Sequence, residues 1–269
     1  YPAKISLPGY RPTFEGHRLQ VNKAAKAINE AKRPLLYVGG GAVISGAEKE
    51  IKELVERAKI PITTTLMALG IYPEDKELAL EMLGMHGTQY ANRATLETDL
   101  VIAVGARFDD RVTGKLDEFI AQADIIQIDI DPAEIGKILD VEIPIIGDVK
   151  EVLQEILPFI EEKENGEWQD RIRELKETYP LKYEDDGSDV IKPQYLMEEI
   201  DKYTNGDATI VTEVGQHQMW AAQFHKYKKP RQFITSGGLG TMGYGLPAAI
   251  GAQIGQPEEK VVLIAGDGS

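Results

Sequence analysis

Short apolar runs that end at a glycine are the feature that most limits how this chain can fold. Glycine directly follows each of the runs Leu35–Val38, Leu100–Val104 and Val261–Ala265. Short runs rich in valine, leucine and isoleucine that are closed by a turn residue are typical of buried strands. Between such runs, apolar residues recur at helical spacing, as in Val21, Ala24, Ala25 and Ile28. This alternation predicts an α/β fold with a parallel, helix-flanked sheet.

The remaining elements follow from the same two patterns. Further strands are predicted at 62–65, 124–130, 143–146, 208–212 and 232–235. Helices are predicted from Arg18, at 47–59, 132–138, 149–161, 168–178 and 193–203, after Gly215, and at 246–254.

A change of composition at 161–190 divides the chain. This stretch is polar and charged on both sides of one predicted helix. We therefore expect a connector at 1–17, a central Rossmann-like α/β domain at 18–160, a linker at 161–190 and the truncated N-terminal part of a second α/β domain at 191–269. Because the second sheet would be incomplete and the sequence does not begin with Met, a fragment or a processed chain is expected.

The balance of charge excludes some partners. Among 269 residues, 30 are Lys or Arg and 44 are Asp or Glu, which gives a formal net charge of -14. Such a surface repels nucleic acid and anionic membranes. The chain has no cysteine, which excludes disulfides, thiolate nucleophiles and cysteine-based metal sites and is compatible with a reducing cytoplasm. No apolar run reaches membrane-spanning length.

Glycine clusters follow predicted strands in the first domain, at Gly39–Gly41, Gly84–Gly87 and from Gly105. The amides of Gly39–Gly41 could bind a phosphate where a helix begins, but their spacing is not the usual Gly-x-Gly-x-x-Gly pattern, and a plain turn is the alternative. Asp129, at a strand end, could accept hydrogen bonds from ribose hydroxyls, or it could cap a helix together with Asp131.

A cluster of charges follows Gly105, where Arg107 and Arg111 flank Asp109 and Asp110. The cluster is either part of a binding site or a surface ion-pair network. His86 could face a flat ring of a ligand, or it could simply complete a turn.

Three segments of the second domain carry candidate chemistry. Gly215–Trp220 lies between a strand and a helix, where a diphosphate could bind, with Gln216 and His217 as donors. The glycine-rich run Ser236–Pro247 permits a close approach to a flat or charged ligand, and Met242 is an isolated apolar residue within it. Asp267 could be a Mg²⁺ ligand at a strand end or a simple turn residue.

The ordered motifs closely resemble the catalytic subunit of acetolactate synthase (acetohydroxyacid synthase), a thiamine diphosphate-dependent family. They are Gly39–Ala42, Thr65–Met67, Gly84–Gly87, Arg107–Gly114, Ile128–Asp131, Gly147–Lys150, Gly215–Phe224, Lys228–Arg231, Ser236–Pro247 and Gly266–Ser269. The resemblance covers essentially the whole chain. It implies the connector, the central FAD-binding domain and the first part of the C-terminal thiamine diphosphate-binding domain of a three-domain subunit.

The resemblance also implies cofactor-binding residues. The expected FAD residues are Gly39, Gly40, Gly41, Leu66, Met67, Gly84, Met85, His86, Gly105, Arg107, Asp129, Ile130, Asp148 and Val149. Those for thiamine diphosphate are Gly215, Gln216, His217, Gly240, Met242, Gly268 and Ser269, with Met242 as an apolar prop. Asp267 would be one Mg²⁺ ligand, and Arg111 would recognise the carboxylate of the second 2-oxo acid near Met85.

The implied reaction joins two 2-oxo acids with loss of CO₂. Pyruvate and a second pyruvate give 2-acetolactate, and pyruvate and 2-oxobutyrate give 2-aceto-2-hydroxybutyrate, early in branched-chain amino acid biosynthesis. The family forms dimers or tetramers, and a small regulatory subunit is a further implied partner. The glutamate that activates the cofactor and the remaining Mg²⁺ ligands are not found in this sequence. We therefore expect the chain alone to be inactive, and its central domain to keep weak FAD affinity.

Two alternatives stay open. Another FAD-carrying thiamine diphosphate enzyme, of the pyruvate oxidase or glyoxylate carboligase type, would share the general motifs, but the runs Arg107–Gly114 and Gly215–Phe224 argue against it. A non-catalytic nucleotide-binding or interaction module would explain the missing glutamate.

Overall fold

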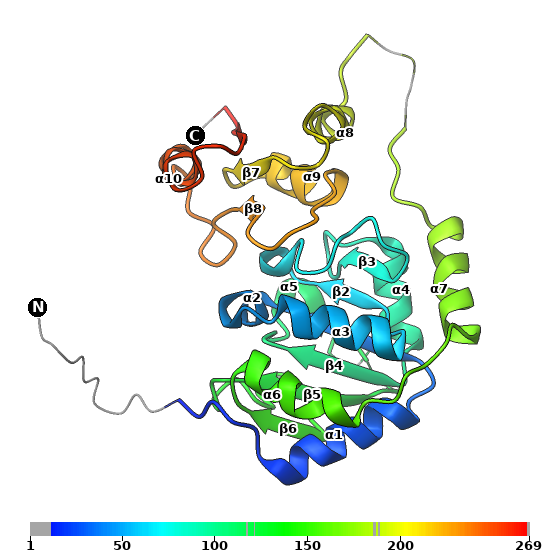
Figure 1. Ribbon diagram of the computed structural model, residues 1–269. Coiled ribbons are helices and arrows are strands. Elements are labelled where there is room, and N and C mark those ends of the chain that lie inside the picture. The colour runs from blue at the N-terminus through cyan, green and yellow to red at the C-terminus, as the bar shows by residue number, and fades with distance from the viewer. Residues whose placement is uncertain (1–11, 117, 121, 185–186, 188, 268–269) are drawn as a thin grey trace, which may run out of the picture.

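The computed structural model describes residues 12–116, 118–120, 122–184, 187 and 189–267. Within them, a larger and a smaller β-sheet lie one above the other, each with its own helices (Figure 1). The larger sheet has the strand order β3-β2-β1-β4-β5-β6 and the smaller one the order β8-β7-β9. All the strand pairs are parallel. The predicted parallel α/β fold is confirmed.

The larger sheet occupies the first part of the chain. Its strands are β1 (Pro34–Val38), β2 (Ile62–Thr64), β3 (Ala79–Met82), β4 (Leu100–Val104), β5 (Asp124–Asp129) and β6 (Ile143–Ile146). Its helical segments are α1 (Arg18–Glu30), α2 (Gly40–Ser45), α3 (Glu48–Ala58), η1 (Leu66–Ala68), α4 (Gln89–Glu97), α5 (Asp110–Thr113), α6 (Val149–Ile156), η2 (Leu157–Phe159) and α7 (Glu167–Thr178). This strand order is that of dinucleotide-binding folds, and it reverses direction between β1 and β4.

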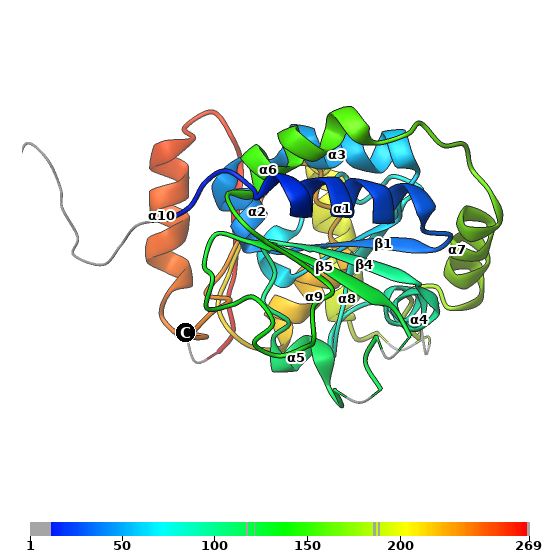
Figure 2. The same cartoon turned by 90° about the horizontal axis from the view of Figure 1, so that it is seen from below.

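Both faces of the larger sheet are buried. Along β1, Leu36 and Val38 join one apolar cluster with residues of α1, α3 and α6, whereas Leu35 and Tyr37 join another with residues of α4 and α7. Side chains alternate between the two faces of a strand, so continuous apolar runs fit strands covered on both sides. Figure 2 shows α1, α3 and α6 over one face and α4 on the other.

Helix α7 lies within the stretch that the sequence predicts as a linker, and it packs on the larger sheet. Trp168 is buried, and its indole nitrogen donates to the carbonyl of Pro34 at 2.9 Å. Arg171 donates to both carboxylate oxygens of Glu97 on α4. The helix therefore completes the cover of one sheet face.

The smaller sheet follows. Its strands are β7 (Thr209–Thr212), β8 (Phe233–Ile234) and β9 (Val261–Ile264), and its helices are α8 (Pro193–Thr204), α9 (Gln216–Phe224) and α10 (Gly245–Gly255). Helix α10 exposes apolar side chains, with Leu246 60%, Ile250 54% and Ile254 75% exposed. No helix in the described part of the chain is long and apolar enough to cross a membrane.

The prediction of a helix at 132–138 is wrong, because this segment forms turns. Gly136 has a φ of +65°, outside the helical region, and its amide donates to the side chain of Gln127 at 3.0 Å. The helix predicted at 149–161 is shorter, since α6 ends at Ile156 and a 3₁₀ turn containing Pro158 follows. Strand β3 and helices α2, α4 and α5 were not given bounds by the sequence patterns.

Candidate functional site

The carboxyl ends of the parallel strands bring the predicted FAD residues to one edge of the larger sheet. Each strand delivers its own turn to this edge. The predicted residues there are Gly39, Gly40 and Gly41 after β1, Leu66 and Met67 after β2, Gly84, Met85 and His86 after β3, Gly105 and Arg107 after β4, Asp129 and Ile130 at the end of β5, and Asp148 and Val149 after β6.

The turns after β1 and β4 touch at the point where the strand order reverses. The amide of Gly39 donates to Val104 O at 2.9 Å, and that of Gly41 donates to Gly105 O at 3.1 Å. A Cβ on Gly39 would lie 2.1 Å from Gly105 O, so a side chain there would collide with backbone. Gly105 itself has a φ of +59°. These glycines serve the close approach of two backbones at the crevice where ligands bind in such folds.

A pocket of about 700 Å³ lies between this edge and the smaller sheet. It gathers seven predicted residues of the larger sheet and three of the smaller one: Leu66, Met67, Met85, His86, Gly105, Arg107 and Arg111, with Gly215, Gln216 and Gly240. Among the other lining residues, Tyr37 is not singled out by the sequence, whereas Thr65, Gln218 and Ser236 belong to the motifs Thr65–Met67, Gly215–Phe224 and Ser236–Pro247 without an assigned role.

Three buried polar atoms at or beside the pocket have no hydrogen-bond partner among the described residues. They are Tyr37 Oη, Thr65 Oγ1 and His217 Nε2. Burial, with the negative charge of Asp109 as a second cause, raises the pKa of the Tyr37 phenol. A buried polar atom without a partner is costly, so these atoms are suited to meeting polar groups of a ligand.

The charged cluster after β4 lies at the rim of the pocket. Asp109 accepts a hydrogen bond from the amide of Arg111 at 3.2 Å and lies 3.9 Å from the guanidinium of Arg107. The hydrogen bond from Arg111 is the main cause that lowers the pKa of Asp109. Phe108, between the two ends of this cluster, is buried at a φ of +54°. Phe108 thus packs into the core, while the charged residues on both sides of it line the pocket.

Other predicted residues lie along the edge but outside the lining of the pocket. Asp129 accepts from the amide of Asp131, and burial raises its pKa. Asp148 caps α6, because its Oδ1 accepts from the amide of Lys150 at 3.0 Å and from Ser45 Oγ at 2.7 Å. Val149 is buried in the core.

The predicted thiamine diphosphate residues lie at the carboxyl edge of the smaller sheet. Gly215 is the residue before α9, and among the described residues no side-chain hydrogen bond to the first amides of that helix is found. Met242 is 60% exposed, and Asp267 is exposed beyond β9. Gly268 and Ser269 lie outside the described residues. Among the residues that the structure does describe, no group of three His, Cys, Asp or Glu is arranged to hold a metal ion.

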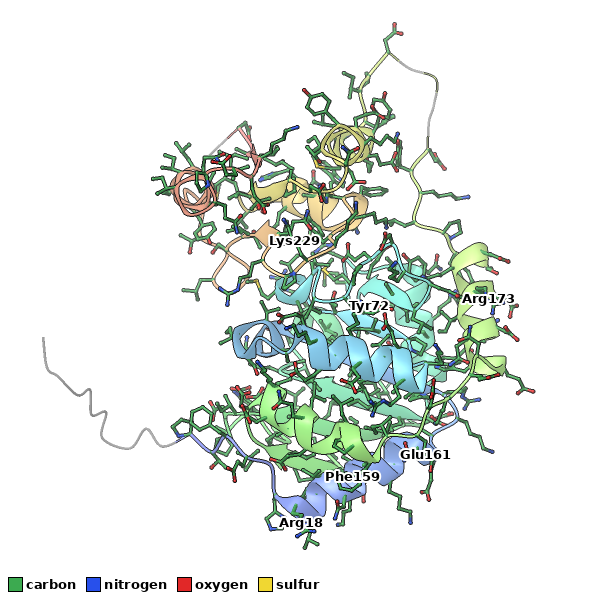
Figure 3. The ribbon with its side chains drawn as sticks, viewed as in Figure 1. Arg18, Tyr72, Phe159, Glu161, Arg173 and Lys229 are labelled. Carbon is green, nitrogen blue, oxygen red and sulfur yellow. The ribbon has the colours of Figure 1, made fainter. Side chains whose placement is uncertain are left out.

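Polar contacts and packing join the two sheets beside the pocket. Gln223 of α9 donates to His86 O at 2.7 Å. Tyr227 and Glu74 bond reciprocally, from Tyr227 N to Glu74 Oε2 at 2.9 Å and from Glu74 N to Tyr227 O at 3.0 Å. Figure 3 labels Lys229 and Tyr72 on either side of this junction. The pocket walls are thus held together by direct contacts.

Comparison with known families and proteins identifies the chain. Residues 21–156 match the central domain of thiamine pyrophosphate enzymes, and residues 213–269 match their C-terminal TPP binding domain. The chain belongs to the thiamine pyrophosphate enzyme family. Thiamine pyrophosphate is another name for thiamine diphosphate, so the predicted family of cofactor-dependent enzymes is confirmed.

The relatives of this thiamine pyrophosphate enzyme chain confirm the predicted resemblance to acetolactate synthase. It is 50% identical to the acetolactate synthase large subunit of Corynebacterium glutamicum, over 100% of this chain and 44% of the relative. It is also 50% identical to a probable acetolactate synthase large subunit of Methanocaldococcus jannaschii, over 99% of this chain and 46% of the relative. The chain thus spans less than half the length of these relatives.

Proposed function

We propose that a protein carrying this chain is an acetolactate synthase catalytic subunit. It would join pyruvate to a second pyruvate or to 2-oxobutyrate with loss of one CO₂, and so make 2-acetolactate or 2-aceto-2-hydroxybutyrate for branched-chain amino acids. Identity to named acetolactate synthase large subunits over the whole chain supports this. The observation that carries the proposal is the shared pocket, which brings Met85 and Arg111 together with Gly215 and Gln216.

The smaller sheet fits thiamine diphosphate. Within the described part of the chain, His217 Nε2 is buried without a hydrogen-bond partner, and no side chain caps the first amides of α9. A Cβ on Gly238 would meet nothing within 4 Å, which leaves room beside the glycine-rich run. When bound, the cofactor supplies an electron sink for the charge left by departing CO₂. Gln216, His217 and the start of α9 would hold its diphosphate, and Met242 would support its rings.

The edge of the larger sheet fits FAD. Tyr37 Oη and Thr65 Oγ1 are buried, belong to residues that line the pocket and have no hydrogen-bond partner among the residues that the structure describes. Arg107 is exposed at the rim, where its guanidinium can pair with a phosphate. In this proposal the flavin is structural and takes no part in net redox chemistry. Asp267 would supply one carboxylate ligand for Mg²⁺, and no group of three His, Cys, Asp or Glu among the described residues is arranged to complete the site.

Arg111 and the apolar lining of the pocket would have different roles toward the substrate. The guanidinium of Arg111 would bind the carboxylate of the second 2-oxo acid through paired hydrogen bonds and so orient its carbonyl. Met67 and Met85, 46% and 70% exposed, line the same pocket and would exclude water around the reacting carbons. Their flexible apolar side chains adapt to substituents of different size.

The assembly and location of the whole protein are part of the proposal. We infer a dimer or tetramer, a small regulatory subunit as a partner, and a cytoplasmic location. The name "large subunit" of the relatives and the absence of cysteine from the sequence support these inferences. We also propose that the two domains of the chain span residues 18–160 and 191–269.

The test uses the full-length protein and matched arginine variants. Arg111→Ala should lower kcat/KM for acetolactate formation from pyruvate about 30-fold, because a charged hydrogen-bond partner of the substrate is lost. Arg173→Ala on α7, which removes an exposed ion pair with Glu77, is the control and should stay within about twofold. Conversion of glyoxylate in preference to 2-oxo acids, or acetyl phosphate as the main product, would contradict the proposal.

The 269-residue chain by itself gives a second test. It should form no acetolactate, and equilibrium dialysis should show weak retention of FAD that Arg107→Ala reduces several-fold. Measurable acetolactate from the chain alone, or no FAD retention, would each contradict one part of the proposal.

A further inference from the structure

Glu213 is a buried carboxylate that none of the assigned roles uses. It follows β7 directly and is 2% exposed, and its amide donates to Ile264 O at 3.0 Å. Among the contacts of the described residues, its carboxylate is bound by two backbone amides and by no cation. Oε2 accepts from Gly243 N at 2.9 Å, and Oε1 accepts from Gly245 N. A buried carboxylate needs hydrogen-bond donors. The two bonds therefore hold the backbone at Gly243 and Gly245 in place as well as the side chain of Glu213.

The amide of Gly245 is the first of α10, and that of Gly243 lies just before the helix, at the end of the glycine-rich run. The residue before that helix, Tyr244, offers it no side-chain cap. Glu213 supplies the cap from another strand, and its negative charge meets the positive end of the helix. A Cβ on Gly245 would lie 2.9 Å from Glu213 Oε1, so the glycine allows the carboxylate to reach this close. Figure 1 shows α10 beside β7.

The glycine-rich run before α10 has few other supports. At its beginning, Thr241 N donates to Ser236 Oγ at 2.9 Å. Leu239, between these two residues, is 95% exposed, and Met242, which follows Thr241, is 60% exposed. A Cβ on Gly243 would meet nothing within 4 Å. The contact with Glu213 is therefore what holds the end of the run that carries Met242.

We propose that Glu213 is a positioning residue for the cofactor-binding run, and that it places Met242 by binding the amides of Gly243 and Gly245. This rests on the proposed function, in which Met242 supports thiamine diphosphate. Glu213 is not among the residues that line the pocket. It acts through the backbone on the residue next to Gly243.

The same carboxylate separates the roles of two neighbouring helix starts. An internal anion already occupies the start of α10, so a diphosphate placed there would be repelled. The start of α9, at Gly215, lines the pocket, and no side chain of the described residues caps it. Glu213 therefore directs the diphosphate to α9 and leaves the run before α10 to the rings of the cofactor.

The test measures thiamine diphosphate affinity in the full-length protein by equilibrium dialysis without substrate. Glu213→Ala should raise the dissociation constant at least about tenfold, since a charged anchor is lost, while FAD affinity stays within about twofold. Glu213→Asp keeps both acceptor oxygens and should recover most of the affinity. Glu259→Gln, which removes an exposed ion pair with Lys229 near the same sheet, is the control and should have no effect.

A double-mutant cycle decides whether Glu213 acts through Met242. If it does, Glu213→Ala combined with Met242→Ala binds thiamine diphosphate no more weakly than Met242→Ala alone. Additive losses, equal losses of FAD affinity, or an unchanged Glu213→Ala variant would overturn the inference. If Glu213→Ala does not fold, Glu213→Gln, which keeps one acceptor, replaces it in the same cycle. Wild-type protein that binds no thiamine diphosphate would instead overturn the proposed function.

Discussion

The larger and the smaller sheet use the same pattern of parallel strands ending in glycine turns, yet they are buried very differently. In the larger sheet, both faces of β1 are covered, and all five of its residues are buried. In the smaller sheet, β7 is buried, but every residue of β9 is only partly buried. Apolar side chains of α10 are exposed as well.

The difference shows where the smaller sheet gets its stability. Its buried residues, such as Ile210, Tyr227 and Phe233, form one cluster with Leu69 and Met82 of the larger sheet. Its other side, at α10, has no such support among the described residues. The smaller sheet is therefore firm at the junction that forms the pocket and weakly supported away from it. Four predictions test this comparison.

The largest effect is expected from the same substitution made in both sheets. Leu36→Ala in β1 should cost about 4 kcal/mol, because the side chain is fully buried and a cavity would remain. Leu263→Ala in β9 should cost about 1.5 kcal/mol, because its side chain is only partly buried. Urea unfolding followed by circular dichroism measures both. Equal costs would show that the two sheets are equally well packed.

The second effect concerns the junction side of the smaller sheet. His225 is 1% exposed and stacks on Tyr227, with ring centroids 4.7 Å apart. Burial is the main cause that lowers its pKa from 6.5 to about 4, although Asp201 opposes the shift. The unfolded chain therefore binds a proton first as pH falls, and stability present above pH 6.5 is lost between pH 6.5 and 4, by up to roughly 3 kcal/mol.

Paired variants isolate this titration. His225→Phe keeps the stacking and cannot bind a proton, so its unfolding free energy should fall less than that of wild type between pH 6.5 and 4. His17→Gln, at an exposed position, is the control and should follow wild type. If the unfolding free energies of wild type and His225→Phe change with pH in parallel, then His225 is not shielded from water at the junction, and the argument fails.

The sequence predicts the parts of the fold that depend on local pattern. Strands β1 and β4 are predictable because they are continuous apolar runs, and helix α1 because Val21, Ala24, Ala25 and Ile28 keep helical spacing; all of these positions are buried. Strand β3 was not given bounds, because Ala79–Met82 is short and includes Glu81 at a φ of +60°. The segment 132–138 is predicted as a helix because its apolar spacing does not show the two bonds that organise the turns, from Gln127 to Glu134 O and from Gly136 N to Gln127.

The parts of the candidate site that follow the ends of strands could be predicted from the sequence. Parallel strands deliver their turns to one edge, so Gly105, Arg107 and Gly215 could be placed there from the sequence. Tyr37 could not, because it lies inside an apolar run and reads as core. Glu213 could not either, since its partners lie 30 and 32 residues further along the chain. Contacts between distant segments leave no local signal.

The third effect comes from the other side of the junction. Glu74 is buried, and burial and then Glu81 raise its pKa well above 4.5. Its stabilising contribution is complete below pH 4.5 and is lost as pH rises through the folded-state pKa, with a slope of at most about 1.4 kcal/mol per pH unit. Glu74→Gln keeps an acceptor for Tyr227 N but cannot ionise. Its unfolding free energy should therefore fall less steeply with pH, and identical slopes would refute the argument.

The smallest effect compares the helix starts of the two sheets. Asp148 caps α6, so Asp148→Ala should cost about 1 kcal/mol in urea unfolding, and Asp148→Asn, which keeps a capping oxygen, much less. The start of α9 in the smaller sheet has no side-chain cap to lose. Asp148 is also a candidate FAD residue, so FAD dialysis on the same variants separates the roles. If capping is its whole role, Asp148→Asn binds FAD as wild type does. If the carboxylate contacts the flavin cofactor, Asp148→Asn loses affinity without losing stability.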